Sequence, residues 1–325
     1  MNNWKHHHVL DLSTFSLEDY NTVLELTTRF KDVHKSSSRK LPALQGRLIA
    51  NLFFEPSTRT RTSFELAAKR LSADVQNFSL SASSLSKGET PLDTILTYIS
   101  MGADILVIRH ESTNVPAELA NYVDINNINT SILNAGDGFH SHPSQGLLDL
   151  FTLATFFNPN EPSTHSLLNK KITIVGDILH SRVALSNIYV LNLLGANVKL
   201  SCPLSLVPKD IEKLNLSVET DIVKALKWCD AVNVLRVQRE RMLKSYFPND
   251  REYSMLFGLD INKLNKIKKD ILILHPGPIN RGVEITSDIV ESNNSIILDQ
   301  VENGVAIRMA IIYLLASKMN FTINE

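Results

Sequence analysis

A segment near the start of the chain has the pattern of a strand that turns directly into a helix. Residues 48–54 form a mainly apolar run of strand length, in which Asn51 is the one polar residue. Pro56 then ends the extended segment. Beyond it, apolar residues recur at helical spacing, at Phe64, Ala67, Ala68 and Leu71. A strand followed directly by a helix is the repeating unit of α/β folds, in which strands and helices alternate. This segment therefore favours an α/β fold.

The same alternation recurs along the chain. Further strands are predicted at residues 73–78, 103–108, 131–133, 171–177, 197–200, 230–235 and 270–274. Strands that alternate with helices form parallel, doubly wound sheets. A polar stretch with two prolines at 158–163 interrupts the series, and 325 residues are enough for two domains. We therefore expect an α/β protein with two doubly wound parallel-sheet domains.

The turn between the first strand and its helix has the composition of an anion site. Consecutive residues there carry hydrogen-bond donors, namely Ser57, Thr58, Arg59 and Thr60. A helix N-terminus adds free backbone N–H groups and the positive end of the helix dipole. Hydroxyl and N–H donors beside a planar guanidinium suit a phosphate. The alternative is an ordinary helix cap, for which a single serine or threonine is enough.

Further polar side chains follow other predicted strands. They are Arg109, His142 and Gln145 in the first half, and Arg182, Arg236 and Gln238 in the second. Parallel sheets bind ligands beyond the carboxyl ends of their strands. We expect these residues to line an active site in the cleft between the two domains and to hold two anionic substrates. The spacing indicates neither a serine–histidine–acid arrangement nor a metal cluster, so positioning and polarisation would supply the chemistry.

Composition and terminal features narrow the function further. The net charge of −1 offers no global field to attract nucleic acid or a membrane. No dinucleotide or P-loop motif follows a predicted strand, which argues against a nucleotide cofactor. Cys202 and Cys229 are the only cysteines, and no apolar signal core follows Met1, so we expect a cytoplasmic protein. The run His6-His7-His8 is expected to be a solvated start and not a metal tract, because no carboxylate or cysteine ligands cluster with it.

Residues 79–90 form a small, polar stretch without periodicity. This composition predicts a mobile loop. Its Lys87 is either solvated or able to reach a phosphate, and spacing alone leaves both interpretations open.

Together the motifs resemble those of the aspartate and ornithine carbamoyltransferase family. Residues 54–65, FEPSTRTRTSFE, resemble its carbamoyl-phosphate signature, and the segments at 83–90, 107–110 and 142–145 match as well. In the second half, RVQRER at 236–241 and HPGPINRG at 275–282 resemble the members that use aspartate. The Ser-Met-Gly and His-Cys-Leu-Pro motifs typical of the ornithine enzymes are missing. One mild variation is Ser144, where many relatives have threonine.

The resemblance implies specific domains and roles. Residues 1–146, completed by a C-terminal helix at 303–325, would bind carbamoyl phosphate, and residues 147–302 would bind aspartate. The phosphate would be held by Ser57, Thr58, Arg59, Thr60, Ser83 and Lys87. The carbamoyl oxygen would be polarised by Thr60, Arg109 and His142, and the carbamoyl amide held by Gln145 and the backbone of Gly277 and Pro278. The carboxylates of L-aspartate would be held by Lys87, Arg182, Arg236 and Gln238.

The implied reaction transfers the carbamoyl group to the α-amine of L-aspartate, the committed step of pyrimidine synthesis, without a cofactor or metal. Relatives form cyclic homotrimers in which the loop with Lys87 crosses into a neighbour's site. Whether a regulatory subunit or a dihydroorotase also binds stays open. One alternative is a carbamoyltransferase for ornithine or another amine, against which the arginines of the second half argue. A more distant alternative is a non-catalytic anion-binding protein, against which Arg109 and His142 argue.

Overall fold

A computed structural model describes residues 4–35, 40–78, 88–209, 211, 216–241, 246–247 and 249–318. The chain divides into two compact units. The first comprises Met1–Phe151, Glu161–Ser163 and Glu302–Glu325, and the second comprises Thr152–Asn160 and Thr164–Val301. Within the described ranges, no helix combines the length and the apolar character needed to cross a membrane.

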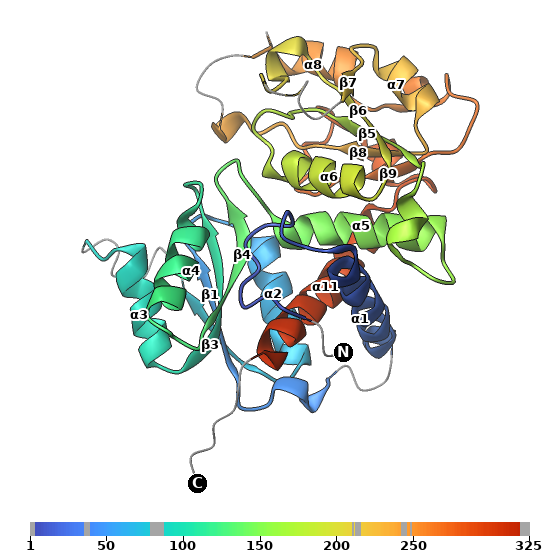
Figure 1. The fold of residues 1–325 in the computed structure, drawn as a ribbon. Coiled ribbons are helices and arrows are strands. Elements are labelled where there is room, and N and C mark those ends of the chain that lie inside the picture. The colour runs from blue at the N-terminus through green and yellow to red at the C-terminus, as the bar shows by residue number, and fades with distance from the viewer. Residues whose placement is uncertain are drawn as a thin grey trace. The chain divides into compact units, whose positions relative to one another are not determined.

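The first unit is built on a four-stranded sheet with helices on both faces (Figure 1). Its strands are β1 (Leu48–Phe53), β2 (Asp74–Phe78), β3 (Ala103–His110) and β4 (Ser131–Asp137). Its helices are α1 (Leu17–Lys35), the short 3-10 helix η1 (Pro42–Leu44), α2 (Thr58–Arg70), α3 (Pro91–Ser100), α4 (Val115–Ile125), most of α5 (Pro143–Phe157) and most of α11 (Ile297–Ser317).

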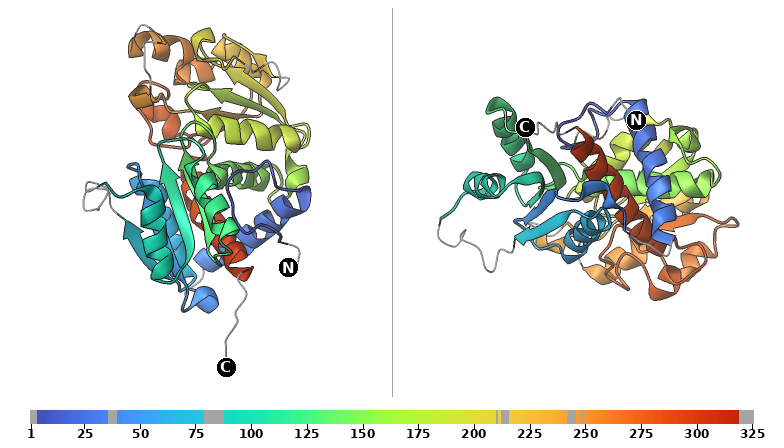
Figure 2. Two further views of the ribbon diagram at one scale, coloured as in Figure 1. Left: turned by 60° about the vertical axis from the view of Figure 1, so that its left-hand side comes forward. Right: turned by 90° about the horizontal axis from the view of Figure 1, so that it is seen from below.

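This sheet is wholly parallel, in the order β2-β1-β3-β4. Helices α3 and α4 cover one face and α2 and α11 the other (Figures 1 and 2). Leu52 of β1 and Ile108 of β3 are neighbours across the two strands. They pack into a fully buried core with Ile95 of α3 and Val123 of α4. Because all strands run the same way, the segments that follow β1, β3 and β4 emerge at one edge of the sheet.

The second unit repeats this plan. Its strands are β5 (Lys171–Val175), β6 (Asn197–Ser201), β7 (Ser217–Val218), β8 (Ala231–Val234) and β9 (Leu272–Leu274). Its helices are α6 (Arg182–Leu193), α7 (Ile222–Trp228), α8 (Asp250–Phe257), α9 (Ile261–Leu264) and α10 (Ser287–Val290), with 3-10 turns η4 (Thr164–Leu167), η5 (Leu204–Leu206) and η7 (Arg239–Arg241).

The second sheet is also parallel, in the order β7-β6-β5-β8-β9. Helix α6 covers one face and α7 the other (Figure 1). Val175, Val232 and Ile273 on three neighbouring strands pack into one core with Leu226 of α7. The segments after β5, β8 and β9 therefore emerge side by side at the carboxyl edge.

The predicted fold class, two parallel α/β sheets, is confirmed. A capping box opens α1, since Asp19 N donates to Ser16 Oγ (3.2 Å) and Ser16 N donates to Asp19 Oδ2 (2.8 Å). The last helix begins at Ile297, earlier than residue 303, where the resemblance places its start. Its first turns alternate polar side chains with exposed apolar ones, such as Leu298, so they lack the apolar character that marks the rest.

Candidate active site

Helix α2 begins at the turn that the sequence predicts to bind an anion. Ser57 is its N-cap, yet the Ser57 side chain accepts no capping hydrogen bond. The backbone bond from Arg61 N to the Ser57 carbonyl (3.1 Å) shows where the helical pattern starts, so the N–H groups before Arg61 have no acceptor within the helix. The first turn contains no acidic residue, and Thr58 and Arg59 are exposed. This helix end therefore presents N–H groups that are not used within the helix, together with the positive end of the dipole, which favours an anion.

Arg109 lies at the end of β3, next to this turn. Phe53 of β1 pairs with Arg109, and the N–H of Phe54 donates to the Arg109 carbonyl at 2.8 Å. The guanidinium is held at two points: Nε lies 2.6 Å from Oε1 of Glu55, and Nη1 donates to the Ala135 carbonyl at 3.2 Å. The Arg109 and Glu55 side chains are only 14% and 13% exposed, so their attraction is poorly screened. Glu55, to which we assigned no role from the sequence, fixes the orientation of this arginine.

His142 lies at the start of α5 and is 4% exposed. Its carbonyl accepts hydrogen bonds from the backbone N–H groups of Gln145 (2.9 Å) and Gly146 (3.1 Å), which makes it the residue from which the helix starts. The turn at residues 137–141 leads into it from β4. His142 is thus placed by the backbone at the same edge as Arg109, because β3 and β4 are neighbours in the sheet.

Asp137 organises the turn before His142. It accepts hydrogen bonds from Asn134 Nδ2 (2.8 Å) and from the N–H of Ser141 (3.1 Å), and it pairs with His140 Nδ1 at 3.1 Å. Burial by itself would raise the pKa of Asp137, but hydrogen bonds from His140, Asn134 and the backbone outweigh burial and lower it. The same hydrogen bond to Asp137 raises the pKa of His140.

Gln145 lies within the first turns of α5 and is 6% exposed. Its amide nitrogen Nε2 donates to Asp149 Oδ1 at 2.9 Å. A carboxylate can only accept, so the nitrogen end of this amide must face Asp149. The amide oxygen is then the end that remains to accept a hydrogen bond from a ligand.

In the second unit, Arg182 is the first residue of α6 and is 3% exposed. It follows β5 after a tight segment in which Asp177 accepts from the N–H of His180 (3.2 Å) and pairs with His180 Nδ1 at 2.7 Å. Ser181 caps the helix by accepting from the N–H of Ala184 (3.2 Å). Burial raises the pKa of Asp177, and the imidazole of His180 opposes that rise. The segment thereby fixes a guanidinium at a helix N-terminus, which favours an anion.

Arg236 and Gln238 follow β8, the neighbour of β5. Both are half-buried. The N–H of Gln238 donates to Asp177 Oδ2 at 3.3 Å, so one carboxylate joins the segment after β5 to the segment after β8. Two strand-end arginines therefore occupy one edge of the second sheet, an arrangement suited to a ligand with two carboxylates.

A third segment at this edge follows β9 and contains Gly277 and Pro278, joined by a cis peptide bond. Its shape depends on His275, which is 2% exposed. Nδ1 of His275 accepts from the N–H of Gly277 at 2.8 Å, and Nε2 faces Glu284 at 3.3 Å. Asn280 Nδ2 donates to the Val237 carbonyl at 3.3 Å and ties this segment to the one after β8.

The predicted residues therefore gather in two sets. Ser57, Thr58, Arg59, Thr60, Arg109, His142 and Gln145 lie at the carboxyl edge of the first sheet, and Arg182, Arg236, Gln238, Gly277 and Pro278 lie at that of the second. Ser83 and Lys87 lie outside the described residues. From the sequence we assigned no role to Glu55, Asp149, Asp177 and His180, whose hydrogen bonds and ion pairs orient the others. A lone carboxylate within the apolar run of α5 was an available signal for Asp149.

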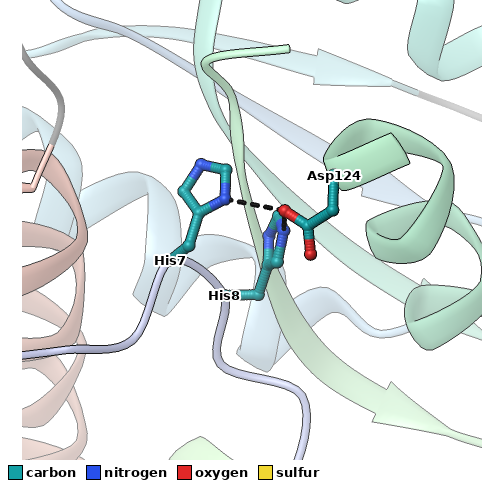
Figure 3. Close-up of side chains that lie close together, drawn as sticks. All are labelled: His7, His8 and Asp124. Carbon is teal, nitrogen blue, oxygen red and sulfur yellow. Dashed lines mark hydrogen bonds and ion pairs between the residues drawn. The ribbon is translucent and has the colours of Figure 1, made fainter. Parts of the chain in front are cut away.

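The histidine run near the N-terminus is not a solvated start, and that prediction is wrong for His6 and His8. His6 Nε2 lies 3.1 Å from Asp19, while His7 Nδ1 and His8 Nε2 both lie 3.0 Å from Asp124 Oδ1 (Figure 3). The carboxylates come from helices α1 and α4, and Asp124 lies 116 residues beyond His8 in the sequence, so local patterns do not show this clustering.

Among the described residues, His7, His8 and Asp124 are the one group whose ligand atoms lie close enough for a metal ion. However, His8 Nδ1 accepts a hydrogen bond from the N–H of Ile132 at 2.9 Å. In the neutral ring the proton must then be on Nε2, where it points at Asp124 and blocks the lone pair that a metal would need. Burial lowers the pKa of His8 and so favours this neutral form. The geometry fits a hydrogen-bonded His–Asp–His cluster.

Comparison with known proteins agrees with the division of the chain into two α/β units. Residues 7–155 match the family model "Aspartate/ornithine carbamoyltransferase, carbamoyl-P binding domain", and residues 168–315 match the "Asp/Orn binding domain" of the same family. The aspartate carbamoyltransferase catalytic subunit of Prochlorococcus marinus (strain NATL2A) is 69% identical, over 97% of this chain and 98% of the relative. That of Acaryochloris marina (strain MBIC 11017) is 52% identical, over 97% and 98%.

Solved structures are similar over nearly the whole chain. The catalytic subunit of M. Jannaschii aspartate transcarbamoylase superposes with a TM-score of 0.81 at 31% identity, covering 98% of this chain and all of the other. Trypanosoma cruzi aspartate transcarbamoylase in complex with N-(phosphonacetyl)-L-aspartic acid superposes with a TM-score of 0.82 at 26% identity, covering 96% and 97%.

The relatives are transferases, and this chain has the same two α/β units, each with cationic and polar side chains at the carboxyl edge of a parallel sheet. The chain belongs to the aspartate/ornithine carbamoyltransferase family.

Proposed function

We propose that this protein transfers the carbamoyl group of carbamoyl phosphate to the α-amine of L-aspartate, giving N-carbamoyl-L-aspartate and phosphate. The observation that carries the proposal is the pair of strand-end arginines, Arg182 and Arg236, in the second unit. Two guanidinium forks match a dicarboxylate and would repel the second amine of ornithine. The relatives named above are aspartate carbamoyltransferases, and the Trypanosoma cruzi enzyme has been solved with carbamoyl phosphate and aspartate.

The first unit binds carbamoyl phosphate. Ser57, Thr58, Arg59 and Thr60 hold the phosphate at the open N-terminus of α2, where hydroxyls, backbone N–H groups and a guanidinium converge. Thr60, Arg109 and His142 donate to the carbamoyl oxygen, while the amide oxygen of Gln145 accepts from the carbamoyl nitrogen. In the proposed complex the carbonyls of Gly277 and Pro278 accept from that nitrogen as well.

The second unit binds L-aspartate. Arg182, Arg236 and Gln238 hold its two carboxylates. The neutral amine attacks the carbamoyl carbon, and a tetrahedral oxyanion forms under the donors of Thr60, Arg109 and His142. The bond from carbon to the phosphate oxygen then breaks, and the leaving phosphate takes the amine proton.

The rate enhancement follows from donors fixed before the reaction and from juxtaposed substrates. Each donor aimed at the developing oxyanion is worth about 2.7–4 kcal/mol. Holding two reactants in place contributes roughly 7–11 kcal/mol at most. The product would enter pyrimidine synthesis, and the two free, buried thiols suit the reducing cytosol in which we place the reaction.

We also propose a homotrimer with shared active sites, in which Ser83 and Lys87 complete the phosphate site of a neighbouring subunit. The support is the match of segment 83–90 to the family pattern, since both residues lie outside the described ranges. Lys87 would act as a point charge on the phosphate and on aspartate.

The test is a transfer assay on the purified chain with labelled carbamoyl phosphate and either L-aspartate or L-ornithine. We expect carbamoyl-aspartate to form rapidly and ornithine to react at background rates. Faster turnover with ornithine would overturn the choice of acceptor. Absence of a carbamoylated product with any amine would instead support a non-catalytic anion-binding protein.

A further inference from the structure

Asp149 and Arg308 are buried charged residues of the first unit that the proposed mechanism does not use. They are 2% and 4% exposed. Burial lowers the pKa of Arg308 to about 10, while the negative charge of Asp149 counteracts that effect. A buried cation is stabilised by a neighbouring negative charge, and the Asp149 carboxylate contributes such a charge.

Arg308 connects helix α11 to α2. Its Nη1 donates to the Gly304 carbonyl at 2.9 Å and to Ser63 Oγ at 3.1 Å. Its Cζ lies 4.9 Å from the centre of the Phe64 ring. Ser63 and Phe64 belong to the same helix whose N-terminus forms the anion turn. The guanidinium is therefore held from several sides in one position.

Gly304 provides the space for this guanidinium. A Cβ at position 304 would lie 2.7 Å from Nη1 of Arg308, closer than side chains tolerate. Any larger residue at this position would force the arginine to move. The absence of a side chain at position 304 therefore leaves room for the Arg308 guanidinium.

Asp149 connects the pair to Gln145. Its Oδ1 accepts from Nε2 of Gln145 at 2.9 Å, and an ionised carboxylate cannot donate in return. As long as Asp149 is ionised, the Gln145 amide cannot turn over. A neutral acid or amide at position 149 could donate, and Gln145 would then be free to present its nitrogen.

We infer that Asp149 and Arg308 are positioning residues that make the site select a carbamoyl phosphate over an acyl phosphate. The charge of Arg308 interacts favourably with the Asp149 carboxylate, and Asp149 fixes Gln145 with its oxygen towards the ligand. The NH2 group of a carbamoyl compound can donate to that oxygen, whereas the CH3 group of an acetyl compound cannot. The inference rests on the proposed function, because it assumes that Gln145 contacts the carbamoyl nitrogen.

Two unreactive probes isolate this contact: phosphonoacetamide, which ends in NH2, and phosphonoacetone, which ends in CH3. Calorimetry on the unmutated protein should show tighter binding of the amide by about 10-fold or more. In Asp149→Asn this preference should fall to about twofold or less through loss of affinity for phosphonoacetamide, while inorganic phosphate binds as before.

Gly304→Ala displaces the Arg308 guanidinium without altering the Asp149 carboxylate and should reduce the preference for phosphonoacetamide as well. Arg308→Lys keeps the positive charge and should retain part of the preference for phosphonoacetamide.

The matched control is Glu118→Gln, which neutralises an exposed carboxylate on α4 and should leave the preference unchanged. A merely structural role would lower the melting temperature and the affinity for both probes alike. An Asp149→Asn protein that still prefers the amide to the unmutated extent overturns the inference, even if carbamoyl transfer to aspartate is confirmed. If the unmutated protein forms no carbamoyl-aspartate, the proposed function and this inference both fail.

Discussion

At the scale of single residues, the second unit contains arginines with different expected roles. Arg236 is half-buried directly after β8, whereas Arg239 is exposed and pairs with Asp250. We expect Arg236→Ala to raise the KM for aspartate by about 10- to 100-fold, because a hydrogen-bonded charge contact is lost. The KM for carbamoyl phosphate should stay nearly constant. Steady-state kinetics check this, with Arg239→Ala as the control that behaves like the unmutated protein. Equal effects of the two substitutions on aspartate would contradict the assignment.

His142 is expected to polarise the carbamoyl oxygen and not to act as a nucleophile. It is placed by the start of α5, in the same edge of the sheet as Arg109. His142→Ala should lower kcat by about 10²- to 10³-fold, the effect of removing one oxyanion donor, and leave measurable turnover through Arg109 and Thr60. Mass spectrometry of the unmutated protein during turnover should find no carbamoyl-histidine. A trapped adduct on His142 would refute the donor role.

At the scale of elements, the start of α2 differs from an ordinary helix end because the Ser57 side chain does not cap it. Ser57→Ala should therefore leave the free energy of unfolding nearly unchanged, yet weaken phosphate binding. The matched control is Asp221, which caps α7 by accepting from the N–H groups of Val223 (2.9 Å) and Lys224 (3.2 Å). Asp221→Ala should cost about 0.5–2 kcal/mol of stability and leave phosphate binding intact. Denaturant unfolding and phosphate titration of both variants make the comparison. The interpretation fails if Ser57→Ala is the variant that loses stability.

The turn before His142 should respond to pH through Asp137 and His140. The pKa of His140 is raised from 6.5, so its contribution to stability is complete below 6.5 and is lost as pH rises through the folded-state pKa. The pKa of Asp137 is lowered from 3.8, so its contribution is present above 3.8 and is lost as pH falls through the folded-state pKa. His140→Gln should thus reduce the free energy of unfolding at about pH 5 more than at about pH 9.

The size of this effect is limited because the His140 side chain is 41% exposed. We expect a difference below about 1 kcal/mol between the two pH values, measured by denaturant unfolding. A larger loss at the alkaline pH would show that the pair does not stabilise the turn in the way described.

How much the sequence predicts depends on the range of the interactions involved. Strand-end positions of Arg109, Arg182 and Arg236 follow from local apolar runs, and the structure places them at the carboxyl edges. Contacts between segments that are distant in the sequence cannot be predicted from local apolar runs. Asp149 and Arg308 each interrupt an apolar helix, which marks a buried charge, but nothing local shows that their charges interact. The histidine run was mispredicted for the same reason, since its partners Asp19 and Asp124 come from other elements.

At the scale of the whole molecule, the net charge of −1 means that cations must be concentrated locally to bind two anionic substrates. Each sheet does this at its own carboxyl edge, where arginines meet helix N-termini. Lys87 would add a further cation from outside the chain that binds the phosphate. The proposed trimer would therefore supply part of the positive charge of each site. This arrangement can be tested without knowledge of the contacts between subunits.

The test is complementation between two inactive variants. Arg59→Ala removes the guanidinium of the anion turn, and Lys87→Ala removes the proposed contribution to a neighbour, so each variant alone should be nearly inactive. After reversible dissociation and mixing in equal amounts, some sites combine an intact Arg59 from one chain with an intact Lys87 from the next. Every chain in a closed ring has one such neighbour, so random assembly restores about a quarter of all sites. Activity should rise on mixing towards that fraction of the unmutated level. If mass spectrometry confirms subunit exchange and activity does not return, Lys87 serves the site of its own chain and the shared-site arrangement is wrong.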